Sequence, residues 1–388
     1  MRLRMILPRV KPSHISPPSK CVYNDCQGTH FRHHQEVRKP LKDTVYAEVV
    51  AHRYECLSCG RTFRIYPEGV NHGQTSLRVK GLAVLLYALG LSYEGTSLAL
   101  EALGVYMAKS SVYEAMQDAA RRVPGLKREQ VFEATRTPAM GADLTSVKCN
   151  GQWLTLGLAV NDIDGLVLTV DELSGEDAET LKEWVGPVAE AVGAKLLVTD
   201  DADGFKQTAD ALDMEHQVCK GHVKRNTEAL IEELGEKVRS DEDGSLASIG
   251  MTVEEALADL EQLRQLISTR QPEDVETLEG MHMRYVQSAA PRSGEKASVA
   301  YRLRLLYLDR WNLWPRLTRY RTWQGPHGER IDGTNNGCER SIGWRIKERY
   351  RSMRGYKRAA SAVNVSRFLA WCGNYLHRGG ADLGLVIA

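Results

Sequence analysis

The sequence predicts a multidomain α+β protein: a mixed α/β domain that is interrupted by an all-helical insertion and preceded by two small domains. Three observations lead to this prediction. Residues 139–218 alternate between strand and helix patterns, residues 227–332 have helical patterns only, and four cysteines lie within the first 60 residues. At 388 residues the chain is longer than one compact core usually holds, so several domains are expected.

Composition and charge point to a water-soluble protein with a polyanionic partner. Residues 1–14 lack the apolar run of a signal peptide, and the apolar stretch Leu82 to Leu91 is too short to span a bilayer. We therefore expect a cytoplasmic, nucleoid-associated protein without a membrane partner. Lys and Arg are in excess in residues 1–140 and 296–388, whereas Asp and Glu are in excess between them. Such basic ends suit a polyanion, although an ordinary solvated surface also explains them.

The first small domain, residues 1–66, is predicted to be a basic arm followed by a zinc ribbon. Two pairs of closely spaced cysteines, Cys21 with Cys26 and Cys56 with Cys59, flank a strand candidate at Val45–Tyr54. Two such pairs supply the four thiolates of a structural Zn²⁺ site. Disulfides or unrelated free thiols are the alternatives, and the reducing cytosol argues against disulfides.

Residues 77–136 are predicted to form a helix-turn-helix DNA-binding region after a linker at residues 67–76. The pattern predicts helices at Leu77–Ala88, Ser92–Leu103 and Val112–Arg122, with Ser110 and Ser111 as caps of the third helix. The spacing resembles a helix-turn-helix in which residues 109–117 enter a DNA groove. The DNA-contacting candidates here are Lys109, Ser110 and Ser111. A plain three-helix connector is the alternative.

Strand patterns begin after Pro138. Strands are expected at Ala139–Ser146, Trp153–Asn161 and Leu166–Leu173, and the Asn150-Gly151 and Asp164-Gly165 pairs between them are typical of hairpin turns. A helix that starts with a capping box at Ser174 and Asp177 follows. A buried strand at Leu196–Val198, a short helix and a strand at Met214–Val218 complete the series.

Three antiparallel strands, a helix, a strand, a helix and a fifth strand is the order of elements in an RNase H-like fold. We assign residues 137–226 and 333–388 to this catalytic domain. Residues 227–332 form the insertion, with helices expected at Val253–Thr269, Pro272–Ser288 and Ala297–Thr322. Most of the tryptophans in the last of these helices are expected to pack in the helical core.

Three acids stand at positions where a metal-dependent nuclease needs them. Asp143 lies on the first strand, Asp200 ends the fourth strand, and Glu339 lies in the first turns of a helix that begins near Thr334 or Asn335. Carboxylates are ligands for Mg²⁺ or Mn²⁺, and two such ions support phosphodiester cleavage. An ordinary cap or surface role is the alternative for each acid. Asp201 is a rival of Asp200, and Asp203 is a weaker one.

Basic residues flank these acids. A predicted stripe on the helix that follows Glu339 suits a DNA strand lying over the site. The stripe consists of Arg340, Lys347, Arg351 and Arg354. Lys224 and Arg225, which follow His222, are further DNA-binding candidates.

Taken together, the chain resembles the DDE transposases of bacterial insertion sequences, and it is similar to their Mutator-like branch. The resemblance depends on Asp143, on Asp200 after Val198-Thr199, on the Cys219-x2-His222 element, on the helical insertion and on residues 335–340, which include Glu339. It implies three catalytic acids holding two Mg²⁺ or Mn²⁺ ions per active site. Cys219 and His222 are expected to support that site: His222 by contacting DNA or the scissile phosphate and Cys219 by packing beneath it, with metal binding by the pair as the alternative.

The resemblance also implies an activity and partners. Such enzymes bind the terminal inverted repeats of their element, hydrolyse the DNA ends and join the 3′-OH ends to target DNA, usually as a homodimer or a higher synaptic complex. A domesticated, non-cutting DNA-binding regulator and an RNase H-like nuclease without strand transfer are the alternatives.

Overall fold

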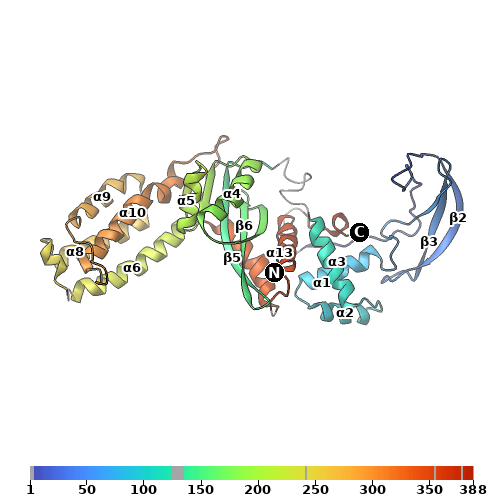
Figure 1. The fold of residues 1–388 in the computed structure, drawn as a ribbon, viewed down its shortest axis with the longest axis horizontal. Coiled ribbons are helices and arrows are strands. Elements are labelled where there is room, and N and C mark those ends of the chain that lie inside the picture. Colours follow the sequence, from blue (N-terminus) through green and yellow to red (C-terminus); the bar gives the residue numbers. More distant parts are fainter. Residues whose placement is uncertain (1–3, 124–134, 241–242, 354, 377–378, 388) are drawn as a thin grey trace.

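The computed structural model describes residues 4–123, 135–240, 243–353, 355–376 and 379–387. The molecule is elongated (Figure 1). A small sheet near the N-terminus forms one end, the helical insertion forms the other, and an α/β core with adjoining helices lies between them.

The core sheet has five strands in the order β7-β6-β5-β8-β9. β5 (Ala139–Cys149) pairs antiparallel with β6 (Gln152–Asn161), and β6 pairs antiparallel with β7 (Val167–Leu173). β8 (Leu196–Thr199) and β9 (Glu215–Val218) are parallel to β5. The predicted sequence of three antiparallel strands followed by two parallel ones is therefore confirmed.

Local chemistry explains the connections of this sheet. Asn150 and Gly151 both have positive φ, as the tight hairpin turn between β5 and β6 requires. Asp177 caps α4 (Ala178–Val192), because its side chain accepts hydrogen bonds from the amides of Glu179 and Thr180. The prediction of a capping box starting at Ser174 is wrong, since the helix begins after Asp177.

Helices cover both faces of the sheet. α4 and α5 (Asp203–Ala211) pack on one face around Trp184 and Phe205. α13 (Ala359–Asn374) packs on the other face against Leu156 and Leu158 of β6. Because both faces are covered, the inner strand β8 is a nearly continuous apolar run, Leu196-Leu197-Val198-Thr199.

The insertion is all-helical, as predicted. Its helices are α6 (Lys220–Ser240), α7 (Ser245–Ser248), α8 (Val253–Thr269), the short η1 (Pro272–Asp274), α9 (Val275–Arg284) and α10 (Val299–Thr322). α6 is one unbroken helix across residue 226, where the sequence analysis divides core from insertion. Trp314 is fully buried and donates to the carbonyl of Gln271, so it packs the helical core as predicted.

The three predicted helices near the N-terminus are present as α1 (Leu77–Ala88), α2 (Tyr93–Ala102) and α3 (Lys109–Arg122). Ser92 caps α2. α3 begins at Lys109 after Ala108 and has no side-chain cap, so the prediction that Ser110 and Ser111 cap it is wrong.

The segment before these helices forms a three-stranded antiparallel sheet of β2 (Phe31–Pro40), β3 (Glu48–Cys56) and β4 (Thr62–Ile65). The described part of the basic arm is held by contacts with the rest of the chain. β1 (Met5–Ile6) pairs with β10 (Ala381–Asp382), which precedes the short η3 (Leu383–Leu385), and the Lys11 ammonium lies 2.9 Å from the Glu68 carboxylate.

The helix that carries Glu339 is not regular. α11 (Asn336–Ser341) continues into the π-helical turn η2 (Ile342–Lys347) and then into α12 (Glu348–Arg351). Asn335 precedes α11, but its side chain does not cap the helix, and Thr334 bonds Asp332 instead. A π turn changes the angular spacing of side chains, so the single stripe predicted from a regular helical period is wrong.

None of the helices in the described ranges is long and apolar enough to cross a membrane.

Gly157 on β6 gives a test of the packing between sheet and helix. A Cβ atom at this position would lie 2.8 Å from Cζ2 of Trp184 and 2.9 Å from Cδ1 of Leu173. Gly157→Ala is therefore expected to lower the free energy of unfolding by about 1–3 kcal/mol, measured by denaturant unfolding. The control is Gly280→Ala at an exposed position of α9, where a Cβ atom would meet nothing within 4 Å. This variant is expected to be neutral or stabilising. Equal stability of the two variants would contradict the observed packing.

Candidate active site

Strand register brings Asp143 and Asp200 together. β5 and β8 are parallel neighbours, and their last paired residues are Gly141 and Val198. Asp143 and Asp200 each lie two residues further on. Since side chains alternate with a period of two, both carboxylates leave the same side of the sheet from adjacent strands. Asp143 lies within β5, whereas Asp200 follows the end of β8.

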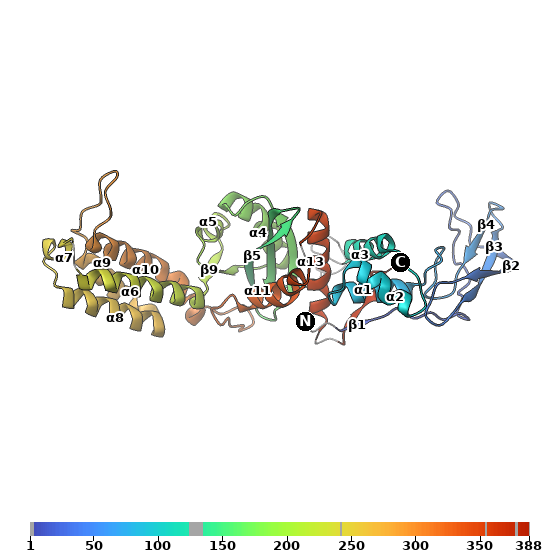
Figure 2. The same ribbon diagram turned by 90° about the horizontal axis from the view of Figure 1, so that it is seen from below.

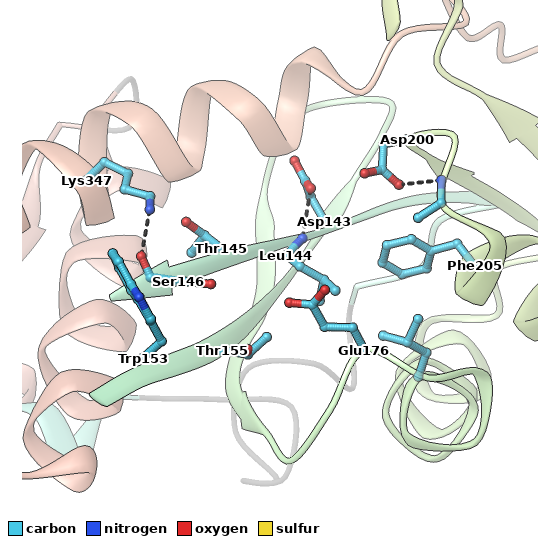
Figure 3. Close-up of a pocket in the computed structure, with 12 residues that line it drawn as sticks. Asp143, Leu144, Thr145, Ser146, Trp153, Thr155, Glu176, Asp200, Phe205 and Lys347 are labelled. Atoms are coloured by element: carbon cyan, nitrogen blue, oxygen red, sulfur yellow. Dashed lines mark hydrogen bonds between the residues drawn. The ribbon is translucent and has the colours of Figure 1, made fainter. Parts of the chain in front are cut away.

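The two aspartates line one pocket of about 790 Å³. Figure 3 shows Asp143 pointing towards the helix that passes above it, with the carboxylate of Asp200 beside it. The Oδ1 atom of Asp143 accepts from the amide of Leu144, and that of Asp200 accepts from the amide of Ala202. Residues that complete the wall include Thr145, Ser146, Trp153, Thr155, Glu176, Phe205 and Lys347.

Glu339 reaches the same neighbourhood from α11. Burial raises the pKa of Asp143 to about 7, and the negative charges of Asp200 and Glu339 add to the rise. Glu339 is not among the residues that line the pocket of the two aspartates, and its charge acts on Asp143 from α11 beside it. Figure 2 shows α11 near β5, and the side-chain amide of Asn335 donates to the carbonyl of Ala142, beside Asp143.

Asp200 and Asp201 have different surroundings. Asp201 lies outside the pocket wall, and its carboxylate is 2.8 Å from the ammonium of Lys206 and 3.9 Å from the guanidinium of Arg310. Asp203 is exposed and pairs with Lys206 as well. Asp200 alone of these three acids lines the pocket.

Cys219 and His222 lie beside Glu339. Cys219 is buried, and Nδ1 of His222 is 3.5 Å from Oε1 of Glu339. The three ligand atoms lie within 4.8 Å of one another. The Cys219-x2-His222 element therefore lies against the third acid.

The four N-terminal cysteines converge and are free thiols. The sulfur atoms of Cys21 and Cys59 are 4.0 Å apart, and those of Cys26 and Cys56 are 3.8 Å apart. Four thiolates at Zn–S distances of about 2.3 Å have sulfur separations of roughly 3.8 Å, so this four-cysteine cluster fits a tetrahedral zinc ion. The guanidinium of Arg61 lowers the pKa of Cys59 to about 6, which favours the thiolate that a metal needs.

The predicted DNA-binding side chains fall into different environments. Lys347 is half-buried, and its ammonium donates to the carbonyl of Ser146 at the pocket wall. Arg340 and Arg351 are exposed near it in sequence, while Arg354 lies outside the described residues. On the first helix of the insertion, Lys224 pairs with Glu228 and Arg225 is exposed.

The proposed groove-binding segment of α3 is only partly accessible. Lys109 and Ser110 are exposed and Ser111 is half-buried at the start of the helix. Gln117, however, is buried and accepts a hydrogen bond from Asn364 of α13. The end of the segment that was predicted to enter DNA, Met116 and Gln117, is therefore packed against the core.

The sequence analysis did not identify most residues of the pocket wall, among them Glu176 and Trp153. Glu176 lies in the loop between β7 and α4, and Trp153 lies opposite Lys148 in the β5–β6 pairing. Trp153 is 65% exposed, unusual for its type, and the Lys148 ammonium lies 5.2 Å from its ring centre. Glu176 has no local signal in the sequence. The Asn150-Gly151 turn, which fixes the hairpin register, could have placed Trp153 across from Lys148.

Comparison with known proteins gives a family. A model described as "Transposase IS66 family" matches residues 75–354, which is most of the chain. The chain belongs to the IS66 transposase family. The matched range contains all three acids and the Cys219-x2-His222 element. The transposase part of the resemblance stated above is thus confirmed, whereas the Mutator-like placement stays a prediction.

No curated protein matches this IS66-family chain. Among solved structures, the HTLV-2 integrase catalytic core domain in complex with magnesium is 18% identical, covers 33% of this chain and 84% of its own chain, and has a TM-score of 0.19. That score is too low to carry an argument.

The raised pKa of Asp143 predicts a pH dependence of stability. Between pH 4 and 7 the folded protein holds a proton on Asp143 that the unfolded chain has lost, so stability falls as pH rises through this window and stays low above about pH 7. In the wild type the free energy of unfolding is expected to fall by about 1–4 kcal/mol across this window. Asp143→Asn is expected to abolish that fall.

The matched comparison is Asp162→Asn. Burial also raises the pKa of Asp162 to about 7, but this residue lies outside the pocket wall. Denaturant unfolding of metal-free protein from pH 4 to 8 measures both contributions. A wild-type slope that survives Asp143→Asn in full would contradict the assigned protonation.

Proposed function

We propose that this chain is a DDE transposase that binds the ends of its own DNA element, hydrolyses them and joins the 3′-OH ends to target DNA. The observation that carries the proposal is that Asp143 and Asp200 line one pocket, while Asn335, at the start of the helix that bears Glu339, donates to the carbonyl of Ala142 beside Asp143. Family membership supports the same reaction class.

The acids fit divalent cations. Three carboxylates that repel one another, one of them buried enough to stay protonated near neutral pH, are compensated best by positive charge. Their oxygen atoms are hard ligands that suit Mg²⁺ or Mn²⁺. Asp143, Asp200 and Glu339 would hold two ions, which when bound lower the barrier to in-line attack on phosphate.

The protein's own groups would position the DNA. The ammonium of Lys347 donates to the carbonyl of Ser146 at the edge of the pocket. There its positive charge would attract a DNA phosphate. Trp153 presents an open indole face at the same end of the pocket, where a base could stack. Hydrogen bonds from the amides of Leu144 and Ala202 orient the two aspartates towards the pocket.

End recognition is proposed to come from the N-terminal part. The four-cysteine cluster would bind one structural Zn²⁺ and fix the β2–β4 sheet, and α1–α3 would act as the helix-turn-helix. The exposed start of α3, with Lys109 and Ser110, is the part of that helix available to a DNA groove. A homodimer or larger synaptic complex would bring two ends together.

Asp200→Asn tests the catalytic assignment. The variant is expected to lose Mg²⁺-dependent nicking of a duplex carrying the element's own end by at least about 100-fold, because it removes a metal ligand, while binding the duplex normally. Asp201→Asn is the matched control: it breaks the pairs with Lys206 and Arg310, so it is expected to lower stability but keep most of the nicking. Nicking assays and gel-shift titrations measure the two properties, and undiminished nicking by Asp200→Asn would refute the assignment.

Metal binding can be tested without DNA. Mg²⁺ is expected to raise the thermal unfolding temperature of the wild type above pH 7, because the ion offsets the repulsion among the acids and binds only the folded state. Asp200→Asn is expected to gain less and Asp201→Asn as much as the wild type. Equal gains in all three proteins would contradict ion binding at Asp200.

A further inference from the structure

Cys219, His222 and Glu339 form a second group of metal-ligating side chains beside the aspartates. Cys219 follows β9, His222 lies in the first turn of α6, and Glu339 lies in α11. The sulfur, a ring nitrogen and a carboxylate oxygen lie within 4.8 Å of one another. The three residues come from two segments more than 110 positions apart.

The backbone holds these two segments in contact. The amide of Lys220 donates to the carbonyl of Gly333, and the amide of Asn335 donates to the sulfur of Cys219 at 3.3 Å. Cys219 is further fixed because its amide donates to the carbonyl of Thr199. The separation between the Cys219-x2-His222 element and α11 is therefore set by hydrogen bonds in which the main chain takes part, including one to the buried sulfur of Cys219 itself.

One of the atoms that could bind a metal has no hydrogen-bond partner among the described residues. This atom is Nδ1 of His222, which is buried. Oε1 of Glu339 lies 3.5 Å from this nitrogen, which is longer than a good hydrogen bond. Leaving a buried ring nitrogen unpaired costs free energy, and an ion between His222 and Glu339 would satisfy both.

We propose that Cys219, His222 and Glu339 bind one Zn²⁺ ion, distinct from the ions held by the aspartates. A thiolate and an imidazole select zinc over Mg²⁺, whereas Asp143 and Asp200 offer hard oxygen atoms only. A tetrahedral zinc site has ligand separations of roughly 3.2–3.8 Å, so small side-chain rotations bring the group to binding distance. Three protein ligands leave the fourth position to water.

An ion at this place would fix the third acid. It would join α6 to α11 and hold one oxygen of Glu339, so that the carboxylate keeps a constant position relative to Asp143. The zinc ion would thus set the geometry of the proposed catalytic acids without lying between them.

Zinc content of the full-length protein tests the inference. After dialysis in Mg²⁺ buffer without chelator, the wild type is expected to hold one more zinc ion per chain than Cys219→Ser or His222→Gln, measured by inductively coupled plasma mass spectrometry. Cys149→Ser, which replaces a free thiol outside both clusters, is the matched control and should equal the wild type. A Cys56→Ser, Cys59→Ser double variant should retain one ion, which Cys219→Ser then removes.

Cobalt gives a second readout. Co²⁺ added to the double variant is expected to show a thiolate-to-metal absorption band that disappears with Cys219→Ser. Circular dichroism shows whether Cys219→Ser and His222→Gln fold. If they do not, Glu339→Gln, which keeps the shape of the side chain, takes their place. It is expected to weaken zinc binding at least about tenfold. Zinc contents equal to the wild type in folded variants, or a cobalt band independent of Cys219, would overturn the inference.

These measurements use no DNA. Their failure therefore leaves the proposed function standing, and failure of the nicking assay leaves the zinc site standing.

Discussion

The pairing of β5 with β8 is the constraint on which the rest of the site depends. Parallel register places Asp143 and Asp200 side by side on one face, although 57 residues separate them in the chain. Two carboxylates so close together, one of them buried, repel each other, and the apolar packing of the sheet keeps them in place. The residues at which β5 and β8 pair, 139–141 and 196–198, are buried, so the repulsion is tolerated because separating the strands would expose much more apolar surface.

The position of Glu339 depends on close contact between α11 and that same pair of strands. Gly141 leaves room for this contact, because a Cβ atom there would lie 3.1 Å from the sulfur of Cys338 and 3.3 Å from Oδ1 of Asn335. Asn335 is fully buried and bonds the backbone of β5 beside Asp143. The residue that the sequence suggested as a helix cap thus serves as the anchor of the acid-bearing helix.

Much of the fold and the identity of the acids could be predicted, because strand periodicity, Asn-Gly turns and closely spaced cysteines are local signals. Contacts between distant segments could not. Arg349 is an example: its guanidinium is buried, donates to the carbonyl of Leu91 and lies 4.4 Å from the ring centre of Tyr87. Nothing near Arg349 in sequence indicates that partner. The same applies to Glu339 and His222, whose contact depends on where a long insertion returns to the core.

The insertion leaves the site intact because its two ends meet. It departs through α6 at Lys220 and returns at Gly333, whose carbonyl accepts from the amide of Lys220. The last helix of the insertion also covers the edge of the sheet. Buried Gln217 of β9 donates to the carbonyl of Leu317 and accepts from the amide of Tyr320, both in α10. An uncovered edge strand is open to pairing with other chains, so α10 both closes the insertion and protects β9, next to the turn that bears Cys219.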